Sequence, residues 1–162
     1  MRKPRIAVRN LHEGEIAELA KKTDHTTLAT WALDCAERVL PFFESKYPED
    51  HRPRVAIETG RAWVKTGMFR MEVIRKAALN SHTSAREAIR DDAARSAARA
   101  AGQAVAAAHV PTHALAAATY AATAIRDAAN PANADAAMTE EREWQYRRLA
   151  DLGRIRMCGP EV

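Results

Sequence analysis

The sequence predicts an all-α fold, and three properties of the chain lead to that prediction. Alanine dominates the 47% of residues that are hydrophobic, whereas aromatic residues make up only 6%. Glycine and proline are few and β-branched residues are sparse, so most of the chain loses little on entering a helix. No segment shows the apolar–polar alternation of a half-buried strand. A length of 162 residues predicts one domain, residues 1–162, with six or seven helices.

Residues that favour helix starts mark the first three helices. We expect these helices at residues 13–22, 23–48 and 53–67. Asp24 is the expected N-cap of the second helix, because its short carboxylate can accept from unpaired backbone N–H groups. Pro41 should kink that helix or end its regular part, since it removes a backbone donor. Pro53 suits the first turn of the third helix.

Four more helices are expected in the rest of the chain, at residues 68–82, 83–110, 113–130 and 138–153. Thr112 is the expected cap of the helix that follows Pro111. The last of these helices should stop at Gly153, and the tail 154–162 should be loose.

The segment from Ala100 to Ile125 contains no Asp, Glu, Lys or Arg. Its two halves, joined at Pro111, predict a central Ala-rich helical hairpin, because alanine lets neighbouring helices approach closely. A membrane hairpin is the competing interpretation. Each half is too short for it, and the side chains are mostly Ala, His, Thr and Gln rather than Leu and Ile. We therefore expect no membrane partner.

Charged side chains lie on one side of the second expected helix. On a wheel of about 100° per residue, the apolar residues of segment 27–43 fill one arc of about 200°, and Asp34, Glu37 and Arg38 lie outside it. A solvated face explains this pattern. Asp34 and Arg38 also flank Trp31 at the edge of the arc, where a helix meets a neighbour or a partner. Both interpretations stay open.

The third expected helix carries its charges beside an apolar arc that contains Trp63. Glu58 lies there among basic residues that include Arg61. This arrangement fits either a solvated ladder of ion pairs or an edge that binds an anion. Trp63 and Trp31 are both expected to be largely buried.

Arg86 lies on a stripe of alanines, extended by Ile89, in the fifth expected helix. A guanidinium on an inward stripe must be paired, because an unpaired buried charge is very costly. Asp34 and Glu58 are candidate partners. We therefore hypothesise that Asp34, Glu58, Arg61 and Arg86 form one partly buried polar network between three helices.

The histidines His82, His109 and His113, together with Tyr120, are the titratable groups of the hairpin region. Such groups often mark sites. Pro111 interrupts the helix between His109 and His113, and no cysteine pair or carboxylate cluster completes a tetrahedral set. We therefore expect no metal and no cofactor.

Catalytic motifs give no further signal. The sequence contains no P-loop, glycine-rich phosphate loop, nucleophile elbow or HExxH. Cys35 falls inside the apolar arc, where a thiol is usually inert. No catalytic residue is assigned, and enzymatic activity is not the favoured interpretation.

The charge balance permits several partners without demanding one. The formal charge is +4, from 25 basic and 21 acidic residues, and the arginines are scattered over several faces. Binding to nucleic acid is therefore not expected. Two cysteines do not make a disulfide framework, and no apolar run follows the basic N-terminus, so a cytoplasmic location is expected.

Two segments, residues 24–63 and 97–121, resemble bacterial and archaeal immunity proteins of the Imm-five-like kind. The resemblance covers about residues 24–127 and leaves the expected helix 138–153 and the tail outside it. It implies a small cytoplasmic helical protein that binds and neutralises a toxin. The matching positions are Trp31, Asp34, Cys35, Arg38, Pro53, Arg54, Glu58, Arg61, Trp63, His82, Ala85, Arg86, His109, His113 and Tyr120.

Two classes of function therefore stay open. The first is a toxin-binding protein that acts through its surface. The basic charge of this chain does not fit one such toxin, a cationic nuclease, because an inhibitor of that toxin should be acidic. The second is a small-ligand binder or enzyme with a polar pocket between helices. Convergence of the polar residues would favour the second class, and their dispersal the first. Assembly of identical chains is also left open. The candidate pocket or interface comprises Asp34, Arg38, Glu58, Arg61, Trp63, His82, Arg86, His109, His113 and Tyr120.

Overall fold

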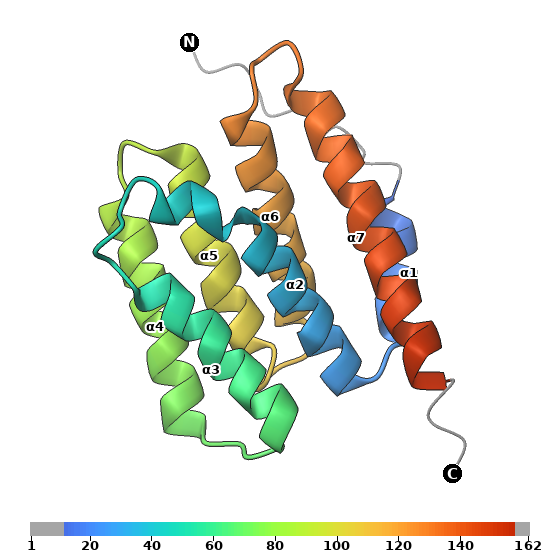
Figure 1. Ribbon diagram of the computed structural model, residues 1–162. Coiled ribbons are helices and arrows are strands. Elements are labelled where there is room, and N and C mark those ends of the chain that lie inside the picture. The colour runs from blue at the N-terminus through green and yellow to red at the C-terminus, as the bar shows by residue number, and fades with distance from the viewer. Residues whose placement is uncertain (1–11, 158–162) are drawn as a thin grey trace.

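Helices form most of the described chain (Figure 1). The structure is a computed structural model that describes residues 12–157, and it contains no strand within that range. The helices are α1 (Glu13–Lys21), α2 (His25–Glu44), α3 (Arg52–Thr66), α4 (Met71–Glu87), α5 (Asp92–Ala106), α6 (His113–Ala128) and α7 (Ala134–Met157). The prediction of an all-α bundle is confirmed.

The hairpin of α5 and α6 lies at the centre of the bundle, as its lack of charge predicted. Helix α5 packs against α2, α3, α4 and α6, and α6 in turn packs against α2 and α7. Alanines dominate the buried surface of the pair, from Ala94 to Ala104 in α5 and from Ala114 to Ala124 in α6. Val105 is buried next to them. Short side chains on both helices allow this close central packing.

Helices α2 and α3 begin and pack as their sequences predicted. The Asp24 side chain caps α2 by accepting from the Thr27 backbone N–H at 3.0 Å. Helix α2 continues through Pro41 and ends three residues later, at Glu44. Gly60 of α3 packs against Leu33 of α2 so closely that an added Cβ would lie 2.6 Å from a leucine methyl group. The small residue at position 60 therefore permits this helix contact.

The boundary between α4 and α5 differs from the prediction. One helix was expected over residues 83–110, but α4 extends to Glu87 and α5 begins only at Asp92. The Asp91 side chain accepts from the Ala94 backbone N–H at 2.9 Å, which starts a new helix at this point. Ile89 lies in the connecting turn and is 74% exposed, so it does not belong to the buried alanine stripe.

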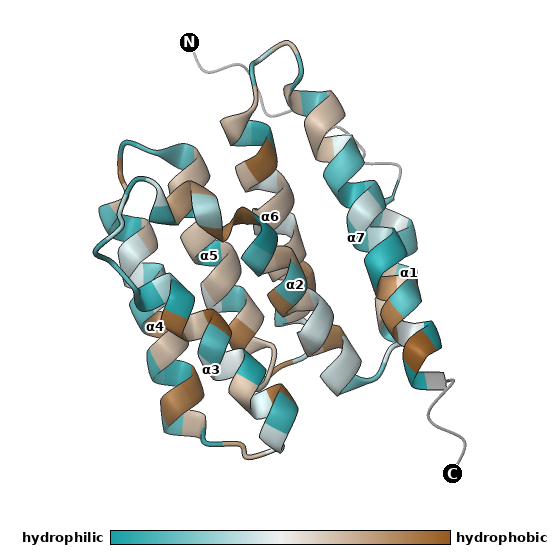
Figure 2. Ribbon diagram, viewed as in Figure 1, coloured by the Kyte–Doolittle hydropathy of each residue, from teal (hydrophilic) through white to brown (hydrophobic). Residues whose placement is uncertain are grey.

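Helix α7 is longer than predicted and lies at the opposite edge of the molecule from α4 (Figure 1). It runs from Ala134 to Met157 and packs against α1, α2 and α6. The first residues of the tail that was expected to be loose are therefore helical, and residues 158–162, with Cys158, lie outside the described range. Figure 2 shows that hydrophilic residues predominate along α7.

The two tryptophans expected in the core differ in burial. Trp31 is completely buried, whereas Trp63 is only partly buried and lies beside His25, with 5.1 Å between the ring centroids. The prediction holds for Trp31 and is only half met for Trp63.

Across residues 12–157, no helix combines the length and the apolar character needed to span a bilayer.

Candidate functional site

A polar network joins α2, α3 and α7, with Asp34 at its centre. Its two carboxylate oxygens accept hydrogen bonds from different helices, one from Arg61 of α3 at 2.7 Å and one from Arg148 of α7 at 2.8 Å. Arg61 also donates to Glu37 at 2.6 Å. Burial alone would lower the pKa of Arg61, but the bonds to Asp34 and Glu37 outweigh it and raise that pKa. The guanidinium therefore stays charged.

A second ion pair of the same region reaches deeper into the protein. Arg38 donates to the Glu141 carboxylate of α7 at 2.9 Å, and the Glu141 side chain is only 2% exposed. The Arg38 guanidinium also lies 3.8 Å from the ring centroid of Trp144, in a cation–π contact. Arg38 thus satisfies a buried carboxylate on one side and covers an aromatic ring on the other.

These residues border a groove of about 530 Å³ between α2 and α7. Three acidic and three basic side chains line it, and each of them takes part in an ion pair. The groove therefore presents little uncompensated charge to a ligand. Its lining residues are Asp34, Glu37, Arg38, Trp144, Arg147, Arg148 and Asp151.

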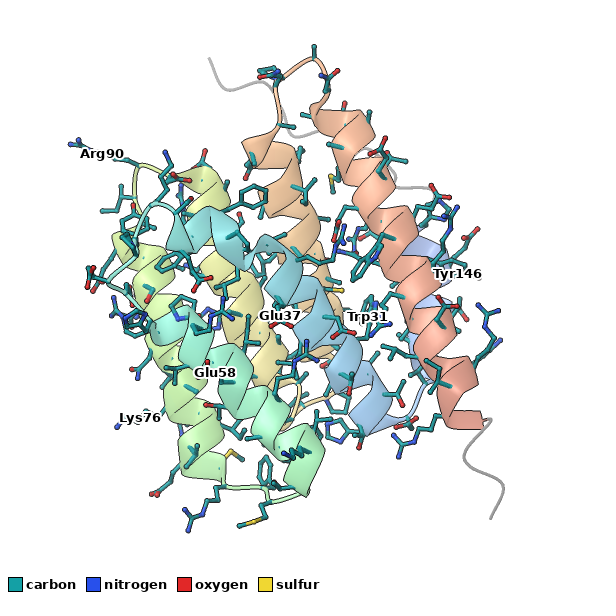
Figure 3. The ribbon with its side chains drawn as sticks, viewed as in Figure 1. Trp31, Glu37, Glu58, Lys76, Arg90 and Tyr146 are labelled. Carbon is teal, nitrogen blue, oxygen red and sulfur yellow. The ribbon has the colours of Figure 1, made fainter. Side chains whose placement is uncertain are left out.

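The hypothesised network of Asp34, Glu58, Arg61 and Arg86 is only partly present. Asp34 and Arg61 are paired, but Glu58 is exposed on α3 and takes part in no ion pair among residues 12–157 (Figure 3). Arg86 is exposed near the end of α4 and donates to Thr83 at 2.7 Å. The inclusion of Arg86 was wrong because the helix expected at 83–110 breaks, which removes Arg86 from the inward alanine stripe.

The three candidate histidines have different contacts, although His113 is among the groups that lower the pKa of His82. The His82 ring packs on Gly102, and its Nδ1 atom is buried without a hydrogen-bond partner in the described part of the chain. Burial, and then the nearby Arg99 and Arg86, lower the pKa of His82. His113 lies within hydrogen-bond distance of the Gln103 side chain, at 2.6 Å.

His109 is exposed and stacks on Phe69, with 6.2 Å between the centroids, and Tyr120 is partly buried against the core. No three side chains of His, Cys, Asp or Glu within residues 12–157 are placed to hold a metal ion. Burial raises the pKa of the Cys35 thiol well above its ordinary value. That thiol is therefore poorly suited to nucleophilic chemistry.

A buried polar cluster on α7 was not anticipated from the sequence. The Trp31 indole donates to the Gln145 backbone carbonyl at 2.8 Å, and the Gln145 amide donates to the Ala118 carbonyl at 2.9 Å. Arg142 is 3% exposed and donates to the Gln145 side chain and to Thr119. It makes no ion pair within residues 12–157, and burial lowers its pKa.

The spacing of the α7 residues could have revealed this inward face. Glu141, Trp144, Gln145 and Arg148 follow one another at i, i+3, i+4 and i+7, which places them on one side of a helix. These residues were missed because an inward helix face is recognised from apolar residues at this spacing. Most of the residues at these four positions of α7 are polar.

Removing the Asp34 carboxylate should destabilise the protein more than removing the Arg86 guanidinium. Asp34→Ala leaves Arg61 and Arg148 without their shared partner, and both are about one-third exposed. We expect a loss of about 1–2 kcal/mol in the free energy of unfolding, between the values for exposed and buried pairs. Arg86→Ala should stay within about 0.5 kcal/mol of the wild type. Urea denaturation followed by circular dichroism measures the free energy of unfolding of both variants. Equal losses would contradict the placement of Asp34 in a network between helices and of Arg86 on the surface.

Comparison with known proteins places this architecture in one family. A family model described as Imm-5 like putative immunity protein matches residues 18–152. Neither the curated proteins nor the solved structures give a match to the chain. The family match extends beyond the resemblance over 24–127 and includes α7 as far as Leu152, which corrects the expectation that this helix lies outside it. Because the match covers most of the chain, the protein belongs to the Imm-5 like putative immunity protein family.

Proposed function

We propose that the protein is an immunity protein that binds a toxin through its helical surface and neutralises it in the cytoplasm. The observation that carries this proposal is the family match over residues 18–152, which takes in all or part of every helix. The partner is then another protein rather than a small substrate. The structure supports a surface mode of action, because the conspicuous charges between α2 and α7 are engaged with one another.

The dispersal of the candidate residues also favours surface binding over an internal ligand pocket. Asp34 and Arg38 line the groove between α2 and α7, but Glu58, His82 and Arg86 do not line it. His82 lies instead against Gly102 of α5, and Arg86 is exposed on α4. A polar pocket formed by all six residues Asp34, Arg38, Glu58, Arg61, His82 and Arg86 is therefore not favoured.

Co-expression with the products of adjacent open reading frames tests the proposal. We expect one such product to arrest growth when expressed alone, and this chain to relieve the arrest and to co-purify with that product. The control is a destabilised variant, Trp31→Ala, which should relieve the arrest poorly. If growth-arresting neighbours are found but none is relieved or bound, or if no neighbour arrests growth, the proposed function fails.

A further inference from the structure

The outward face of α4 carries an exposed leucine among basic side chains. Leu79 is 52% exposed. A single exposed leucine is common on protein surfaces, so its meaning depends on its neighbours. Arg75 and Lys76 lie four and three residues before it, and Arg86 lies seven residues after it, so all share the face of Leu79. In Figure 3, Lys76 extends away from the neighbouring helices.

The charges of this face are not neutralised by the protein itself. Arg75, Lys76 and Arg86 make no ion pair among residues 12–157, and neither do Arg70, just before α4, and Arg90, in the turn after it. Glu72, in the first turn of α4 and seven residues before Leu79, shares this face and offsets one of these charges. Glu87 and Asp91, next to Arg86 and Arg90 in sequence, pair with Arg52 and Lys46. On α7, the arginines at positions 147, 148, 154 and 156 each pair with a carboxylate, and Arg142, which makes no ion pair within residues 12–157, is buried. Lys22, Lys65, Arg99 and Arg142 are the other basic residues without an ion pair in residues 12–157, so the largest group of unpaired cations there lies on and next to α4.

Apolar side chains continue from this face into the turn between α3 and α4. Met68 is 69% exposed, Phe69 44% and Met71 41%, whereas Val73, 46% exposed, is six residues from Leu79 and lies on another side of α4. Met71 lies eight residues before Leu79, which at a rise of about 1.5 Å per residue is about 12 Å along the helix. Exposed apolar residues gathered in this way mark interaction surfaces more often than scattered ones do.

A second hollow lies along the other side of α4. This groove of about 830 Å³ is bounded by α4, the start of α3 and the preceding loop, and Val55, which is 47% exposed, lies in its wall. The Glu87 carboxylate on this side is already paired with Arg52. Glu49 and Asp50 also line the groove, and Arg52 pairs with Asp50 as well as with Glu87, so the groove is acidic and bounds the basic face on this side.

We infer that the outward face of α4 and the α3–α4 turn form the docking surface for an acidic protein surface that presents apolar side chains at its centre. Arg75 and Lys76 lie one turn before Leu79 and Arg86 two turns after it, so the fitting partner has carboxylates on both sides of an apolar contact. The inference deepens the proposed function, on which it rests for the identification of this partner as the toxin. It also agrees with the basic net charge of +4.

A protein fits this surface better than a nucleic acid does. Phosphate backbones are bound by basic grooves, usually with aromatic side chains on which bases stack. Here the residue between the cations is the aliphatic Leu79, the adjoining Met68 and Met71 are not aromatic, and Phe69 is already stacked on His109. Methionine, phenylalanine and arginine are enriched at the cores of protein interfaces. From Arg70 to Arg86 the face is about 24 Å long at 1.5 Å per residue, which suits a standard interface.

A charge-reversal experiment tests the surface without needing the toxin. The binding probe is a labelled 20-residue synthetic helix with leucines on one face and glutamates beside them. Wild-type protein should bind it, as measured by fluorescence anisotropy. Arg75→Glu with Lys76→Glu should weaken that binding by at least about tenfold, because like charges would then face each other. Leu79→Ser should weaken it as well, through the lost apolar contact.

The matched control reverses the same number of charges on α7. Arg147→Glu with Arg154→Glu alters side chains that are 71% and 73% exposed, and it should leave binding within about threefold. Circular dichroism melts check that all variants stay folded. Failure of the wild type to bind, or an equal loss in the control, would overturn the inference. So would tighter binding of a 20-base-pair DNA duplex that is insensitive to Leu79→Ser.

The same variants separate this inference from the proposed function. In the growth assay, the α4 double variant should no longer relieve the arrest by the neighbouring gene product, whereas the α7 double variant should still relieve it. Relief by both variants would refute the docking surface and leave the immunity function standing. Absence of relief even by the wild type, together with peptide binding that depends on α4, would refute the immunity function and leave the surface standing.

Discussion

Replacing Trp31 with alanine is expected to lower the free energy of unfolding by about 3–5 kcal/mol. The side chain is completely buried, so its removal leaves a large cavity between α2 and α7. It also leaves the Gln145 carbonyl without its indole donor, which lies at 2.8 Å. Denaturation in urea at neutral pH, followed by far-UV circular dichroism, measures the loss.

Trp63→Ala is the matched comparison, because the same side chain is removed from a partly buried position. It should cost clearly less than Trp31→Ala. Trp31→Phe should recover most of the apolar contact but not the hydrogen bond, and it should fall between Trp31→Ala and the wild type. A change at Trp31 of less than about 1 kcal/mol would contradict the central position given to this residue.

Replacing Arg38 with methionine is expected to destabilise the protein by about 2–3 kcal/mol, because a buried carboxylate loses its partner. Methionine retains much of the apolar stem, but the Glu141 carboxylate, 2% exposed, no longer has a charge opposite it. Breaking a fully buried pair costs about 3–5 kcal/mol, and the 41% exposure of Arg38 reduces that figure. Arg147→Met removes an exposed arginine from the same helix bundle and should cost about 0–1 kcal/mol.

A double variant separates the lost attraction from the unpaired buried charge. Arg38→Met combined with Glu141→Gln should be less destabilising than the sum of the two single changes, because the second change removes the charge that the first leaves unpaired. Thermal and urea unfolding of the four proteins gives the coupling energy. If the loss in the double variant equals the sum of the two single losses, Arg38 and Glu141 do not stabilise each other in solution.

Sequence patterns were sufficient where apolar and polar residues separate cleanly. The arc around Trp31 placed α2 correctly, and the charge-free segment identified α5 and α6 as the central pair. The pairing of Asp34 with Arg61 also follows from the edges of two amphipathic helices. These features depend on local periodicity and burial, which the sequence displays directly.

Other features depend on contacts that no local pattern displays. The turn before α5 occurs in a segment where every residue tolerates a helix, so only the cap at Asp91 indicates it. The partners Glu141 and Arg148 lie more than a hundred residues from Arg38 and Asp34 along the chain. On α7 the inward face is polar, so its pattern resembles a solvated helix. Long-range pairing of polar groups therefore had to come from the structure.

The alanine packing of α5 and α6 has a consequence for the thermodynamics of folding. Alanine has no side-chain rotamers to lose on burial, so this core orders its side chains at almost no entropic cost. Each alanine also buries little apolar area, and apolar area governs the heat-capacity change of unfolding. That change should therefore lie at the low end of about 12–15 cal/mol/K per residue. The stability of the bundle then varies only gently with temperature.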